Sequence, residues 1–125
     1  MTAIRAVVVT AFLTGCVPVQ PMPPPQTPGQ AWYAATAAYT VAAESAVTYR
    51  RECLAKPRIL QADCRAAVLA LARIDREAME IQEYGNLAVA DGDADMLEEA
   101  IEALDRIKRR LQDHLAEQME KEGRL

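Results

Sequence analysis

Proline is confined to one short stretch of this 125-residue chain, with a single exception. Six of the seven prolines fall between Val17 and Gln30, and only Pro57 lies further along the chain. Proline fixes φ and lacks the amide hydrogen that helices and sheets require, so residues 17–30 are predicted to form an extended spacer. At about 3.1 Å per residue, such a spacer would reach roughly 40 Å. An alternative interpretation of its PMPPP segment is a ligand for an aromatic-lined groove.

The remaining residues have a composition that favours helices. The whole chain contains 24 alanines, whereas Phe, Trp and Tyr together number six. This composition disfavours a β-sandwich with a bulky aromatic core, and the length allows one small domain. Breaks are predicted at Ala55-Lys56-Pro57 and Asp91-Gly92-Asp93. Helices are therefore expected over about 31–54, 61–89 and 95–122.

Apolar and small residues recur at alternating spacings of three and four in each predicted helix. The first seam comprises Trp32, Ala35, Tyr39, Ala42, Ala46, Tyr49 and Cys53. The second comprises Leu60, Cys64, Ala67, Leu71, Ile74, Ala78, Ile81, Gly85 and Ala88, and the third Leu97, Ala100, Leu104, Ile107, Leu111, Leu115 and Met119. Three such seams can face one another. They predict an all-α fold, either an antiparallel helical hairpin or a three-helix bundle, after the proline-rich linker.

The first sixteen residues have the outline of a secretion signal. Arg5 precedes an apolar run over residues 6–13, which is too short to span a bilayer. The run ends at Leu13-Thr14-Gly15-Cys16, which resembles the lipobox of bacterial or phage-encoded lipoproteins. The resemblance covers only this N-terminal segment. It implies cleavage before Cys16, a diacylglyceryl group on the Cys16 sulfur, and acylation of the new amine.

The same resemblance implies a location for the protein. In Gram-negative lipoproteins of this kind, an Asp just after the cysteine commonly retains the protein at the inner membrane, and here Val17 occupies that position. The expected location is the cell envelope, anchored to the outer membrane by lipid and facing the periplasm. The resulting division is a signal peptide over 1–15, the lipidated cysteine and linker over 16–30, and a helical domain over 31–125.

Cys53 and Cys64 lie on either side of the first predicted break, each on the seam of its helix. In an antiparallel hairpin they would meet, and export would place them in an oxidising compartment. A disulfide between them is therefore predicted. The alternative is a redox or metal site, which the ten-residue gap and the lack of a nearby histidine disfavour.

The exported chain shows no residue pattern typical of catalysis. Its candidate nucleophile, Ser45, and its single histidine, His114, lie on different predicted helices. The net charge of -4 gives no basic surplus for binding nucleic acid. We therefore expect a protein that is not an enzyme, uses no cofactor and does not bind nucleic acid.

The second predicted break has an alternative interpretation as a calcium-binding loop. Its acidic residues fall at positions 1, 3, 5 and 12 of the calcium-loop register; these are Asp91, Asp93, Asp95 and Glu102. Position 6 is Met96, where the sharp turn of such a loop requires glycine. The simpler interpretation, with no metal, is a reciprocal helix cap formed by Asp95 and Glu98.

The aromatic residues Trp32, Tyr33, Tyr39 and Tyr49 form an alanine-rich face on the first helix. This face is expected in the core, or else it receives a partner protein or a second copy of the chain. The expected function is a membrane-tethered envelope scaffold or protein-interaction module. One alternative is a lysis subunit, because the lipobox and proline-rich start resemble those of phage outer-membrane spanin subunits. Another is a surface exclusion lipoprotein.

Overall fold

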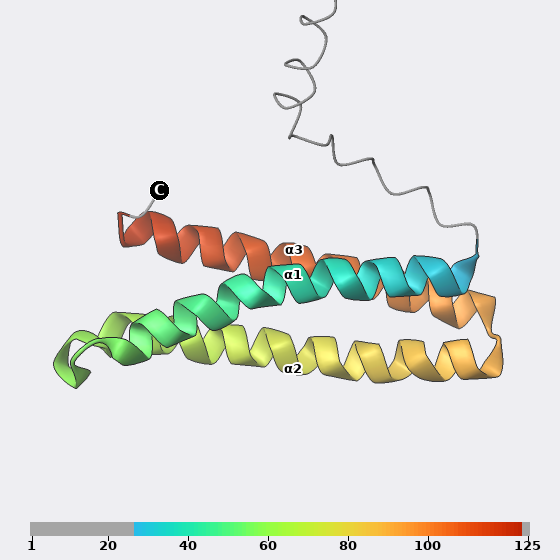
Figure 1. The fold of residues 1–125 in the computed structure, drawn as a ribbon, viewed down its shortest axis with the longest axis horizontal. Coiled ribbons are helices and arrows are strands. Elements are labelled where there is room, and N and C mark those ends of the chain that lie inside the picture. Colours follow the sequence, from blue (N-terminus) through green and yellow to red (C-terminus); the bar gives the residue numbers. More distant parts are fainter. Residues whose placement is uncertain (1–26, 124–125) are drawn as a thin grey trace, which may run out of the picture.

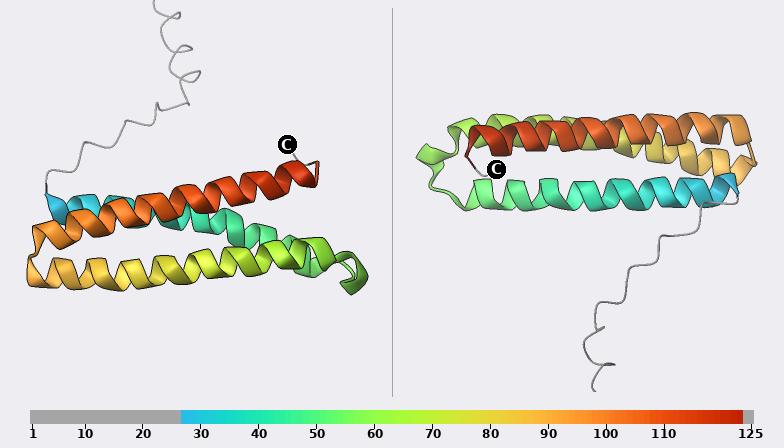
Figure 2. Two further views of the ribbon diagram at one scale, coloured as in Figure 1. Left: turned by 180° about the vertical axis from the view of Figure 1, so that it is seen from behind. Right: turned by 90° about the horizontal axis from the view of Figure 1, so that it is seen from above.

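The computed structural model describes residues 27–123, which form three long helices and one short 3-10 turn. The helices are α1 (Pro28–Ala55), α2 (Ala62–Asp91) and α3 (Ala94–Lys121), and the 3-10 turn η1 (Arg58–Leu60) joins the first two. Successive helices run in opposite directions, and α1 lies obliquely across the pair formed by α2 and α3 (Figures 1 and 2). The all-α prediction is confirmed in its three-helix form.

Helix α1 begins three residues earlier than predicted. The Thr27 hydroxyl accepts a hydrogen bond from the Gln30 amide at 3.2 Å and so caps the helix. Pro28 occupies the first helical position, where its missing amide hydrogen has no intrahelical acceptor to bond. The predicted linker is therefore too long at its C-terminal end, since 28–30 belong to the helix. Residues 17–26 of the predicted linker lie outside the described residues.

The turn between α2 and α3 also differs from its prediction. Gly92 adopts a left-handed conformation, with φ of 65°, and ends α2. The side chain of Asp93 then caps α3 by accepting a hydrogen bond from the Met96 amide at 3.0 Å. The predicted cap formed by Asp95 and Glu98 is wrong, because the left-handed glycine reverses the chain early and leaves Asp95 inside the first turn.

The three predicted seams form the core. Of their members, eighteen are buried, and Ala35, Ala46, Ile81 and Met119 pack partly buried against them. The exception is Leu60, which is 63% exposed. Leu60 is the last residue of the η1 turn and precedes the start of α2 at Ala62, so the helical register of that seam does not extend back to it.

Trp32 packs the N-terminal part of α1 against α2. Its side chain is 2% exposed and lies directly on Gly85. A Cβ atom added at Gly85 would lie 2.2 Å from the Trp32 ring, so only glycine leaves room for it. The Trp32 indole also donates a hydrogen bond from Nε1 to Oδ1 of Asn86, at 3.0 Å. Together these contacts fix the position of α1 along the axis of α2.

We expect Gly85→Ala to lower the free energy of unfolding by about 1–2 kcal/mol. The clash with the Trp32 ring outweighs the roughly 1 kcal/mol by which alanine favours a helix interior. Thermal and urea unfolding followed by circular dichroism would measure the change. Gly29→Ala is the matched control, since an added Cβ there meets nothing within 4 Å. Equal stabilisation by both substitutions would contradict this account.

Candidate functional site

Most of the predicted aromatic interaction surface is buried in the core. Trp32, Tyr39 and Tyr49 are 2%, 3% and 4% exposed and belong to the core, because α2 and α3 together cover that side of α1. Of the four aromatic residues only Tyr33 is exposed, at 69%. The core interpretation is confirmed for three of them, and the surface interpretation is corrected.

The opposite side of α1 carries almost no charge. Between Pro28 and Tyr49 the only charged residue is Glu44. The exposed side chains there follow one another at helical spacing and are here named the α1 outer face: Tyr33, Ala37, Thr40, Val41, Glu44 and Thr48. This face was not predicted from the sequence, although the presence of a single charged residue over five helical turns indicates it.

Threonine hydroxyls along α1 are satisfied by their own helix. The Oγ1 atoms of Thr36, Thr40 and Thr48 donate to carbonyl oxygens one turn earlier, at 2.8, 2.9 and 3.1 Å. Such bonds occupy the hydroxyl hydrogen and leave the methyl group free for apolar contact. The α1 outer face is consequently less polar than its threonine content indicates.

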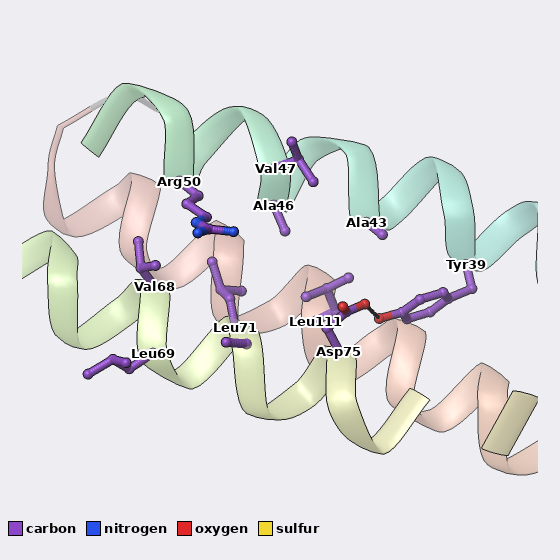
Figure 3. A pocket seen from close by; sticks show the side chains of 11 residues that line it. Tyr39, Ala43, Ala46, Val47, Arg50, Val68, Leu69, Leu71, Asp75 and Leu111 are labelled. Carbon is purple, nitrogen blue, oxygen red and sulfur yellow. Dashed lines mark hydrogen bonds between the residues drawn. The ribbon is translucent and has the colours of Figure 1, made fainter. Parts of the chain in front are cut away.

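A groove of about 320 Å³ lies beside this face, between α1 and α2 (Figure 3). Small residues of α1, Ala43 and Ala46, leave the space between the helices unfilled. Its other apolar walls and floor are provided by Val47, Val68, Leu69, Leu71, Ala72 and Leu111. The polar groups in its lining are Arg50 and the pair formed by Tyr39 and Asp75. This arrangement suits an apolar side chain from a partner.

Tyr39 and Asp75 form the polar contact of the groove. The Tyr39 hydroxyl donates to Oδ1 of Asp75 at 2.7 Å. Burial, followed by this hydrogen bond and the charge of Asp75, raises the pKa of Tyr39 well above its ordinary value. Tyr39 therefore stays a neutral donor, and the pair anchors the middle of α1 to α2.

The disulfide prediction is confirmed. Cys53 near the end of α1 and Cys64 near the start of α2 are bonded, with Cα atoms 5.9 Å apart, and both are buried. The Gln61 side chain adds to this closure, since its Nε2 donates to the carbonyl oxygens of Lys56 at 2.6 Å and Leu54 at 3.3 Å. The loop between α1 and α2 is thus held at both ends.

Surface charges pair mainly along and between α2 and α3. Arg110 makes a two-pronged contact with Glu77, at 2.9 and 3.1 Å, which lowers the pKa of Glu77. Asp105 pairs with Lys108 and Arg109, and both contacts lower the pKa of Asp105. Contacts of this exposed kind contribute little to stability. These charges form a solvated helix surface.

The structure does not gather the residues of the predicted calcium loop. Asp91 is the last residue of α2, Asp93 caps α3, and Asp95 lies in the first turn of α3. Glu102 follows two turns later in the same helix. Within residues 27–123, no three His, Cys, Asp or Glu side chains converge to hold a metal ion.

The predicted signal peptide and Cys16 lie outside the described residues. None of the helices in the described part of the chain is long and apolar enough to cross a bilayer. Comparisons with protein-family models, with curated proteins and with solved structures find no match to this chain.

Reduction of the disulfide should lower the free energy of unfolding by about 3 kcal/mol, because it releases a loop whose ends are 11 residues apart. Urea unfolding with and without reductant measures this difference. A Cys53→Ala, Cys64→Ala double variant should match the reduced protein and show no response to reductant. Alkylation of both cysteines without prior reduction would contradict the bond.

Tyr39 should make stability depend on pH in the alkaline range. Below about pH 10 both the folded and the unfolded chain hold the Tyr39 proton, and its contribution is fully present. Above that value the unfolded chain loses the proton first, so stability falls as pH rises. Melting temperature should decline less steeply in Tyr39→Phe than in the wild type. Tyr33→Phe, which removes an exposed tyrosine, should keep the wild-type slope; equal slopes in all three proteins would contradict the assignment.

Proposed function

We propose that the protein is a membrane-tethered envelope lipoprotein that acts as a protein-interaction or scaffold module. In this proposal Cys16 carries the lipid anchor in the outer membrane, the proline-rich segment is the spacer, and the bundle faces the periplasm. The lipobox-like Leu13-Thr14-Gly15-Cys16 supports the anchor. The Cys53–Cys64 disulfide supports export, since such bonds persist in oxidising compartments.

The observation that carries the interaction part of the proposal is the α1 outer face. A helix that packs on a bundle through one side normally carries charged residues on the other. Here that outward side has one charged residue over five turns, with Tyr33 and Val41 69% and 66% exposed. The apolar groove lies along its edge, with Val47 54% exposed on the rim. A contiguous surface with so little charge is typical of a protein contact.

The anchor is tested by the intact mass of protein purified from envelopes. Loss of residues 1–15 with acyl mass on Cys16 is the expected result. Cys16→Ser should abolish both the cleavage and the added mass. An unmodified full-length chain would contradict the anchor.

The interaction surface is tested by photo-crosslinking in intact cells, with the photoreactive residue placed at Ala37. A discrete adduct is expected, and Val41→Glu in the same chain should remove it, because that charge would be desolvated in the contact. The matched control places the photoreactive residue at Gln112, an exposed position on α3. Absence of an adduct from Ala37, or the same adducts from Gln112, would contradict the proposal.

A further inference from the structure

The end of α1 and the loop that follows it expose large apolar side chains. Ile59 is 87% exposed, Leu60 63% and Leu54 51%. This end of the bundle extends past the C-terminal end of α3 (Figure 2), so these side chains lie at an extremity of the molecule. Residues 50–65, which include the end of α1, η1 and the start of α2, are here named the disulfide tip.

The exposed side chains of the disulfide tip are held outward by a constrained backbone. The Cys53–Cys64 bond closes the loop, and the Leu60 amide donates to the Pro57 carbonyl at 2.8 Å. The Gln61 side chain binds two further carbonyl oxygens of the loop. Because the loop is fixed in this way, Ile59 and Leu60 are presented to an external surface with little conformational entropy to lose on binding.

The charge of the disulfide tip is opposite to that of the rest of the bundle. It contains five basic residues and two acidic ones; the basic residues are Arg50, Arg51, Lys56, Arg58 and Arg65. The other end of the molecule is built largely from residues 77–105, which contain ten acidic residues and no Lys, Arg or His. The two ends of the long axis of the bundle therefore carry opposite net charge, and the disulfide tip is the positive end.

We infer that the disulfide tip docks on the surface of an anionic phospholipid bilayer. Basic side chains near such a surface are attracted to its headgroups, and exposed apolar side chains among them insert at the boundary with the acyl chains. The acidic end is repelled by the same surface, which orients the bundle with the tip toward the lipid. The inference is independent of acylation at Cys16, since only residues of the tip carry it.

The test introduces a fluorescent reporter at the tip of the full chain. Ile59→Trp is measured on phosphatidylcholine vesicles with and without phosphatidylglycerol, using brominated acyl chains as quenchers. Leu87→Trp is the matched control, because Leu87 is 61% exposed and lies in the acidic half of α2. The signal of the buried Trp32 is subtracted using the wild-type chain. Both positions are exposed, so neither substitution disturbs the core.

The expected result is quenching of the tryptophan at position 59 on vesicles that contain phosphatidylglycerol, several-fold stronger than at position 87. Adding Lys56→Gln and Arg58→Gln should reduce that quenching by about half or more, since each basic side chain adds to the attraction. Equal quenching at both positions, or equal quenching on phosphatidylcholine alone, would overturn the inference. Absence of quenching on every vesicle would also overturn the inference, and a protein would then be the remaining candidate partner of the tip.

Discussion

The position of α1 depends on one close contact, the Trp32 ring seated on Gly85. Helices α2 and α3 are joined by a tight turn, and their facing side chains fill the space between them. Helix α1 is connected only through the longer η1 loop, and its inward side is mostly alanine and tyrosine. The position of α1 is therefore determined at its two ends. Near the N-terminal end the Trp32 ring packs on Gly85, and near the C-terminal end the Cys53–Cys64 disulfide joins α1 to α2. Tyr39 and Tyr49 complete the attachment, with hydrogen bonds of 2.7 Å to Asp75 and Glu122.

Much of this fold was predictable because its signals are local. Pro57 and Gly92 mark the two breaks, and a seam with spacings of three and four marks the buried side of each helix. The disulfide followed from the same seams, since both cysteines lie on them beside one break. The errors occurred at helix ends, where the geometry of a single residue decides the outcome. Pro28 starts α1 because its missing donor costs nothing there, and Gly92 shifts the cap from Asp95 to Asp93.

The candidate surfaces were less predictable than the fold. The seam containing Trp32 was compatible with a two-helix hairpin that leaves its aromatic residues open, or with a three-helix bundle that covers them. Only the placement of α3, which is remote in sequence, decides between these. The groove between α1 and α2 exists because Ala43 and Ala46 are too small to fill the space between the helices, and the separation of the helices is not encoded in any single segment. The exposure of Ile59 likewise depends on the closed geometry of η1.

The outward side of α1 has a composition that the bundle itself does not require. Its inner side meets the packing demands, with Trp32 on Gly85 and the tyrosines bonded to their acceptors. Stability imposes little on exposed helix positions beyond helix propensity, and Lys, Glu and Arg meet that demand at least as well as Thr, Val and Tyr. Helix α3 shows the ordinary solution, with charged residues along its exposed positions. Because the bundle does not account for the missing charges on α1, we propose this face as the site of contact with another molecule.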